Sequence, residues 1–237
     1  MKYFLSLFAF VGALFIPTPS FAMENCPLQV NRAYKSLNSA AVWYLGDNCK
    51  KKAFAKSSIY FTYFNSWDEV LVNDDIEQIP NDEIPWMAKG PLYKPAEGAV
   101  VKTLHDPKVY FLFGDKKYWI DSGESFINLG YKWNWVEDVD QRLLEKYQQG
   151  TQISDSKGHP PYVLVKKPED AKVYRLEPDF DHDRTKFVLR HIANAEVFRD
   201  LGYRFDRVIE LPEESEYNPF LVPGGAFARE REIGDPI

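Results

Sequence analysis

Residues 101–139, VKTLHDPKVYFLFGDKKYWIDSGESFINLGYKWNWVEDV, contain the pattern on which the fold prediction rests. An apolar strand is predicted to end at Lys102, a second covers residues 109–112, a third covers residues 118–120, and a short helix ends before Gly130. Short β-branched and aromatic runs separated by turn residues are typical of strands, and glycine is favoured just past a helix. The stretch therefore predicts a strand–strand–strand–helix unit.

The same pattern occurs twice more in the chain. A lysine stands seven residues before the valine that opens the second strand, in the pairs Lys35 and Val42, Lys102 and Val109, and Lys166 and Val173. A residue able to cap a helix stands four residues before a phenylalanine, in the pairs Ser57 and Phe61, Ser122 and Phe126, and Asn194 and Phe198. Each copy ends in an aromatic residue followed three positions later by valine, in the pairs Trp67 and Val70, Trp133 and Val136, and Phe205 and Val208. We expect the three phenylalanines to be buried alike beneath capped helices. The chain is thus predicted to be a β-rich α+β protein of three tandem β-β-β-α repeats, stacked or propeller-like.

These patterns divide the chain into seven parts. The third repeat is longer because eight residues are added between its second and third strands, where insertion costs little. The predicted parts are a signal peptide (1–22), repeat 1 (23–72), a connector (73–98), repeat 2 (99–147), a second connector (148–161), repeat 3 (162–214) and a C-terminal tail (215–237).

The first residues predict export. Lys2 precedes an apolar run, and small residues at Ser20 and Ala22 form a cleavage site of the secretory type. A membrane anchor is the alternative, but the run is shorter than the ~20 residues that a span needs. The chain is therefore expected to be extracytoplasmic, either periplasmic or secreted, with no transmembrane segment after cleavage.

Composition and cysteine content agree with that address. Cys26 and Cys49 are the only two cysteines, and in an exported chain two cysteines most simply form one disulfide. Two free thiols for metal or redox work are the alternative, but the expected CxxC spacing is absent. The net charge of −6 disfavours nucleic acid, a polyanion, as a partner.

Candidate sites are few. The aromatic residues Tyr118, Trp119, Trp133 and Trp135 are candidates for ligand binding, since one aromatic face should stay partly open; covering of the core is the alternative. Asp179, Asp181 and Asp183 alternate in a turn and are candidates for calcium, with a plain acidic hairpin tip as the alternative because the rest of an EF-hand is missing. No other cofactor is predicted. No catalytic motif is found, and the histidines do not show metal-ligand spacing: His105, His159, His182 and His191.

Part of the chain resembles known sequences. VVK at 100–102, VYFL at 109–112, IDSGESF at 120–126 and GYKW at 130–133 are similar to a repeat of uncharacterised secreted bacterial proteins, with the pattern LVK, VYxL, GK, IxSxExF and GYxW. That resemblance implies a role in the cell envelope and offers no catalytic residues. The run at 109–119 is also locally similar to a hemopexin-type propeller blade, which would imply a binding module.

These observations favour a non-catalytic exported protein that binds a cell-envelope glycan or a partner protein. The competing class is an extracytoplasmic carbohydrate-active enzyme. In that class Glu137 or Asp138, beside Trp133 and Trp135, would act on glycan by paired carboxylate chemistry.

Overall fold

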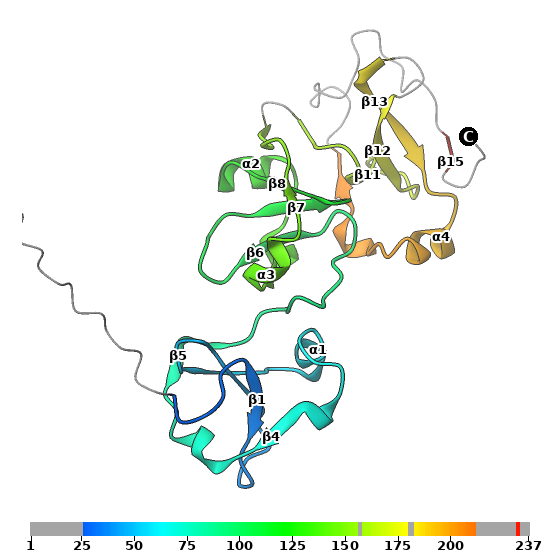
Figure 1. The fold of residues 1–237 in the computed structure, drawn as a ribbon. Coiled ribbons are helices and arrows are strands. Elements are labelled where there is room, and N and C mark those ends of the chain that lie inside the picture. Colours follow the sequence, from blue (N-terminus) through cyan, green and yellow to red (C-terminus); the bar gives the residue numbers. More distant parts are fainter. Residues whose placement is uncertain (1–25, 156–157, 180–182, 212–230, 233–237) are drawn as a thin grey trace, which may run out of the picture.

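A computed structural model of the chain describes residues 26–155, 158–179, 183–211 and 231–232. These residues form three five-stranded mixed sheets and a few short helices (Figure 1). The predicted β-rich α+β class is therefore confirmed. No helix in the described part of the chain has the length and apolar character needed to cross a membrane. The predicted signal peptide lies outside the described residues.

The first sheet belongs to what we call unit 1, residues 32–86. Its strand order is β4-β1-β2-β3-β5; the central three strands are antiparallel, whereas β4 runs parallel to β1 and β5 runs parallel to β3. Its elements are β1 (Arg32–Lys35), β2 (Trp43–Leu45), β3 (Lys51–Ala53), α1 (Ser57–Tyr60), η1 (Trp67–Glu69), β4 (Val70–Val72), η2 (Asp74–Glu77) and β5 (Asn81–Trp86).

Units 2 (residues 100–149) and 3 (residues 164–232) have the same strand order and directions, β10-β8-β7-β6-β9 and β14-β11-β12-β13-β15. Unit 2 contains β6 (Val100–Thr103), β7 (Tyr110–Phe113), β8 (Lys116–Trp119), α2 (Gly123–Asn128), η3 (Trp133–Trp135), β9 (Glu137–Val139), α3 (Gln141–Leu144) and β10 (Gln148–Gln149). Unit 3 contains β11 (Leu164–Lys166), β12 (Tyr174–Asp179), β13 (Asp183–His191), α4 (Ala195–Asp200), η5 (Phe205–Arg207), β14 (Ile209–Glu210) and β15 (Arg231–Glu232).

The units differ from the prediction in having two more strands each. The additional strands follow the helix and pair in parallel with the two outer strands of the predicted antiparallel trio. Two of them lie in segments predicted as connectors: β5 within 73–98 and β10 within 148–161. Propeller blades are four-stranded and antiparallel, so these five-stranded mixed sheets are built differently.

The helix prediction holds in two units and is one residue out in the third. The side chains of Ser122 and Asn194 cap α2 and α4, and Phe126 and Phe198 are each 1% exposed. In unit 1 the prediction was wrong: Ser57 lies inside α1, whose N-cap is Lys56 without a side-chain cap, and Phe61 is 43% exposed. Tyr60, fully buried and four residues after Lys56, takes the position of the buried phenylalanines.

Each sheet has two buried faces, which we call the helix face and the rear face. The helix face of unit 2 is covered by α2 and carries Val100, Phe111 and Phe126; its rear face carries Val101 and Leu112 and is covered by α3 through Leu143 and Leu144. In unit 1 the rear face packs under η2 and the N-terminal segment. The predicted disulfide is present there, joining Cys26 and Cys49 with their Cα atoms 5.5 Å apart.

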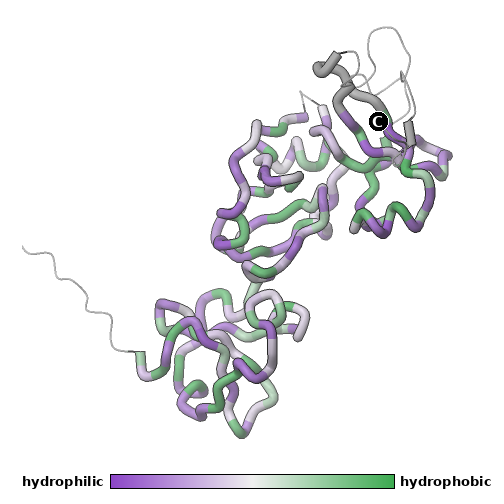
Figure 2. The backbone as a smooth tube through the Cα atoms, turned by 45° about the vertical axis from the view of Figure 1, so that its right-hand side comes forward, coloured by the Kyte–Doolittle hydropathy of each residue, from purple (hydrophilic) through white to green (hydrophobic). Residues whose placement is uncertain are grey.

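Units 2 and 3 share one core. The helix face of unit 2 packs against the rear face of unit 3, so that residues of both sheets form a single cluster, among them Phe111, Phe126, Tyr131, Val165, Tyr174, Leu176 and Ile209. Unit 1 instead has its own helix-face and rear-face clusters. Figures 1 and 2 show it set apart and joined to the others by one segment of chain, with apolar stretches in all three units.

Candidate functional site

One half-exposed aromatic ring occupies the same place in every unit. It begins the 3-10 helix that follows the short helix, seven residues after the buried ring of that helix. We call Trp67, Trp133 and Phe205 the platform residues; they are 48%, 54% and 54% exposed.

Each platform ring lies flat on the buried ring beneath it. The ring centroids are 4.2 Å apart for Tyr60 and Trp67, with 15° between the planes. The corresponding pairs are Phe126 with Trp133 (4.3 Å, 28°) and Phe198 with Phe205 (4.0 Å, 15°). The stacking fixes the orientation of each platform ring and leaves part of it open to solvent.

The turn between the two stacked rings is built in the same way in units 2 and 3. Gly130 and Gly202 take the left-handed conformation, with φ of 77° and 75°. The amides of the following residues, Tyr131 and Tyr203, donate to the carbonyls of Phe126 and Phe198. This helix stop reverses the chain, so that the platform ring returns over the helix.

Of the four aromatic residues predicted to bind ligand, only Trp133 is more than half exposed. Trp135 is 4% exposed in the core shared with unit 3. Tyr118 packs on Phe111 toward the helix face, with ring centroids 6.3 Å apart, whereas strand alternation sends Trp119 to the rear face. The four residues therefore do not form one surface. The sequence signal for the other platform residues was the aromatic residue that ends each copy of the repeat.

The calcium prediction falls partly outside the described residues. Asp179 ends β12 and Asp183 begins β13, but Asp181 between them is not described. Within the described ranges, no group of three or more histidine, cysteine, aspartate or glutamate side chains could hold a metal ion. Calcium binding at this hairpin stays a prediction.

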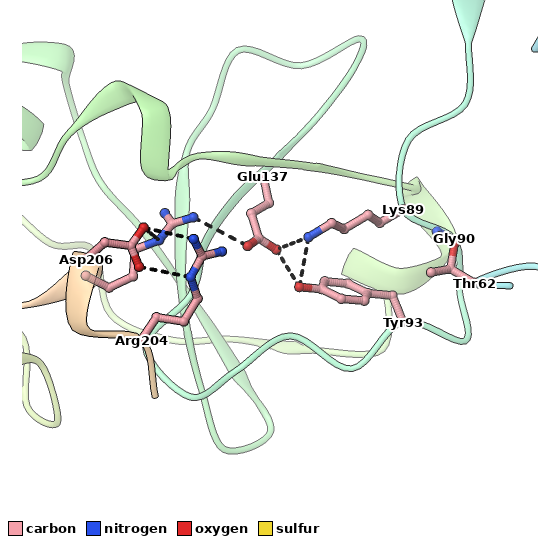
Figure 3. A network of polar contacts seen from close by, with 8 residues as sticks. Thr62, Lys89, Gly90, Tyr93, Glu137, Arg204 and Asp206 are labelled. Carbon is pink, nitrogen blue, oxygen red and sulfur yellow. Dashed lines mark hydrogen bonds and ion pairs between the residues drawn. The ribbon is translucent and has the colours of Figure 1, made fainter. Parts of the chain in front are cut away.

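Glu137 lies where the three units meet (Figure 3). Its Oε2 accepts hydrogen bonds from Lys89 Nζ (2.8 Å) and the Tyr93 hydroxyl (2.7 Å), and its Oε1 lies 3.6 Å from Arg207 Nη2 of unit 3. Lys89 belongs to the segment between units 1 and 2. Next to it, the Gly90 amide donates to Thr62 Oγ1 of unit 1. Glu137 thus ties unit 2 to unit 3 and to the segment that joins units 1 and 2.

Arg204 and Asp206 form the outer part of the same network. The Arg204 guanidinium donates two hydrogen bonds to the Asp206 carboxylate, of 3.0 and 2.8 Å (Figure 3). This pairing holds the pKa of Asp206 below its usual value. Desolvation by burial lowers the pKa of the nearby Arg207 guanidinium, with a further contribution from the charge of Arg204.

The carboxylates of the competing enzyme hypothesis are occupied by these ion pairs. Asp138, the neighbour of Glu137, lies 2.7 Å from Lys102 Nζ. A glycosidase needs one carboxylic acid with a raised pKa to protonate the leaving group. Among the described carboxyl groups whose pKa is clearly shifted, the pKa is lowered in every case. These groups are Asp82, Asp121, Asp140, Asp170 and Asp206. Comparison of the sequence with models of known protein families and with curated proteins found no match.

Proposed function

We propose that this protein is an exported, non-catalytic repeat protein that binds a cell-envelope glycan through its platform residues. The observation that carries the proposal is the recurrence of a half-exposed ring, stacked on a buried ring, at the same place in three units. The apolar face of a sugar ring stacks on such a surface. Because the ring beneath already fixes each platform ring, little conformational freedom is lost on binding.

One platform per unit favours a polymer over a single sugar. Each contact alone is weak, since an aromatic contact contributes about 0.5–1.5 kcal/mol beyond its buried area. Several contacts to one chain raise the overall affinity by making the later contacts intramolecular. The disulfide is compatible with an oxidising compartment outside the cytoplasm and supports the same address.

Co-sedimentation of the purified protein with insoluble cell-wall polymer and with chitin tests the proposal. Trp67→Leu and Trp133→Leu keep an apolar cover over the buried ring but remove the flat surface. We expect each to weaken binding about fivefold to tenfold, and the double variant to weaken it more, because one platform contributes about 1 kcal/mol.

Trp86→Leu is the matched control. Trp86 is 53% exposed like the platform residues but stacks on no ring among the described residues. Its replacement should leave binding unchanged. If the double platform variant sediments as well as the Trp86 variant, the platforms do not bind the polymer and the proposal fails. Soluble reducing sugar released from the polymer would instead show turnover, in favour of the enzyme.

A further inference from the structure

An open cleft of about 990 Å³ lies between units 1 and 2. One wall is the helix face and the β2–β3 turn of unit 1, with Tyr44, Lys52 and Tyr63. The other wall is the start of α3 and the loop after β6, with His105 and Arg142. None of the platform residues lines it, so it is separate from the proposed glycan surface.

The cleft occupies the position that the shared core occupies between units 2 and 3. There, the helix face of unit 2 meets the uncovered rear face of unit 3. Here the helix face of unit 1 meets a rear face that α3 already covers, because Leu143 and Leu144 pack on Val101 and Leu112. Sheet-to-sheet packing is thereby blocked, and the space between the two walls stays open.

The cleft crosses a fixed junction between the two units. The Tyr63 hydroxyl donates to Asp140 Oδ2 (2.9 Å), and Arg142 holds the same carboxylate with two further hydrogen bonds of 2.9 and 3.1 Å. Burial would raise the pKa of Asp140, but these hydrogen bonds outweigh it and lower the pKa. Lys89 adds a parallel bridge to Val139, so the walls are held in position.

Donors stand beside acceptors in the lining, as ion pairs of Lys50 with Glu83, Lys52 with Asp82 and Arg142 with Asp140. Lys52 has a side chain only 17% exposed, lies 3.6 Å from Asp82 Oδ1 and makes no hydrogen bond with any residue that the structure describes. Charged groups of both signs line the walls: Lys50, Lys52 and Arg142 against Asp47, Asp82, Glu83 and Asp140. Side-chain amides stand among them, at Asn31, Asn48 and Gln141. Such a lining matches a ligand with its own amides and charges of both signs.

The rings of the cleft are unsuited to stacking on sugar. Tyr44 is only 8% exposed, and its hydroxyl donates to Asn31 Oδ1. Tyr63 is packed against Tyr44 on one side (5.7 Å between ring centroids) and has the Arg142 guanidinium 5.7 Å from its own centroid. We propose that the cleft binds an extended peptide segment of mixed charge, independently of the platform residues.

Nuclear magnetic resonance titration of the full-length protein tests this proposal. The probes are a pool of synthetic hexapeptides built from Glu, Lys and Ala, and chitohexaose in a parallel arm. We expect the peptides, with a Kd on the order of 0.1–1 mM for so small a ligand, to shift amide signals of residues 44–52, 82–88, 103–105 and 139–142. Chitohexaose should shift signals around the platform residues and leave those of the cleft unmoved.

Two variants of one short helix provide the matched test. Gln141→Trp places a bulky side chain in the cleft from an exposed position at the start of α3. Glu145→Trp places the same side chain at the exposed end of that helix, away from the cleft lining. Both remove the hydrogen bond between Gln141 and Glu145, so they differ in where the new ring lies.

Gln141→Trp should weaken peptide binding about tenfold or more, while Glu145→Trp should bind as the unmodified protein does. Cleft shifts caused by chitohexaose, absence of peptide shifts at millimolar peptide, or equal binding by the two variants would each overturn the peptide proposal. Sedimentation of the platform variants is a separate measurement, so the peptide proposal can fail while the platform proposal holds, and the reverse.

Discussion

The chain has two junctions between units, one between units 1 and 2 and one between units 2 and 3. At each, the helix face of the earlier unit meets the rear face of the later one. Between units 2 and 3 the faces fuse into one apolar core, in which Phe111 is 1% and Val165 is 1% exposed. Between units 1 and 2 the contacts are polar: the bond from Tyr63 to Asp140, the Lys89 bridge and the ion pair of Lys89 with Glu137. A single helical turn, α3, accounts for the difference because it covers the rear face of unit 2.

The difference indicates two folding bodies in one chain. Units 2 and 3 cannot separate without exposing their common core, so they should unfold as one. Unit 1 has its own cores and its own disulfide and should unfold by itself. The helix face of unit 3 fits this view, since at the place where unit 2 has Phe111 it carries Arg175, which donates to the Tyr203 hydroxyl and pairs with Glu177. A polar outer face is expected of a terminal unit in a stack.

The largest effect should come from emptying the shared core. Phe111→Ala removes a ring at its centre and should lower the free energy of unfolding by about 3–5 kcal/mol. Hydrogen exchange followed by mass spectrometry should then show faster exchange throughout units 2 and 3, with unit 1 unchanged. Arg175→Ala, at the same register position on the helix face of unit 3, is the control and should cost about 1–3 kcal/mol, because the buried Glu177 keeps its pair with Arg190. Loss of protection in unit 2 alone would contradict a shared core.

Opening the disulfide should act on the other body. The link between Cys26 and Cys49 spans 23 positions of the sequence, and its loss as a double Ser variant should cost about 3 kcal/mol through the entropy of the unfolded chain. Because both cysteines pack with the rear-face cluster of unit 1, the added exchange should be confined to that unit. Equal destabilisation of units 2 and 3 would show that the chain folds as one body.

Mild acid should loosen the junction of units 2 and 3. His159 is 3% exposed, its Nε2 lies 2.7 Å from the carbonyl of Leu129 at the end of α2, and burial lowers its pKa to about 4. The unfolded histidine, with a pKa of about 6.5, takes up a proton at a pH where the folded one stays neutral. Stability should therefore fall as the pH drops from about 6.5 toward 4, by roughly 3 kcal/mol at most, and level off below.

Urea unfolding at a series of pH values measures this loss. His159→Gln keeps a hydrogen-bond donor for the Leu129 carbonyl but does not titrate, so its stability should stay nearly constant between pH 6.5 and 4. An equally steep fall in that variant would assign the acid effect to other groups. The cleft carboxylates are a separate effect, since the lowered pKa values of Asp82 and Asp140 place their protonation at more acidic pH.

Local chemistry decides which parts of this arrangement could be predicted from the sequence. Ser122 and Asn194 were predictable helix caps because the cap hydrogen bond lies within four residues. Lys56 has no such side chain, so α1 was placed one residue late and Phe61 was taken for Tyr60. The parallel edge strands were missed because β4 and β5 pair with strands roughly 30 residues or more away, and no local pattern records such pairing.

The candidate sites divide in the same way, into residues marked by a local pattern and a cleft that depends on how distant elements pack. Trp133 could be predicted as a partly exposed candidate for binding, and the aromatic residue that ends each repeat already pointed to Trp67 and Phe205. The cleft could not be predicted, because it depends on which rear face α3 covers. The one local signal was Asp140, which caps α3 through the Arg142 amide. From sequence it reads only as a helix start, whereas in the fold its carboxylate also joins two units.

The smallest and most specific difference should come from one methyl group. Gly130 and Gly202 end α2 and α4 in the same left-handed conformation, so alanine at either position costs about 1–2 kcal/mol in backbone strain. At Gly130 the new Cβ would lie 2.8 Å from Cγ2 of Ile209 in unit 3, whereas at Gly202 it would meet nothing within 4 Å. Ile209 is 3% exposed in the shared core and has little room to move. Gly130→Ala should therefore cost about 1–3 kcal/mol more than Gly202→Ala in urea unfolding.

Because the two positions match in backbone conformation, the difference reports on the packing between the units alone. If the two alanine variants are equally stable, α2 of unit 2 does not pack tightly against Ile209 of unit 3.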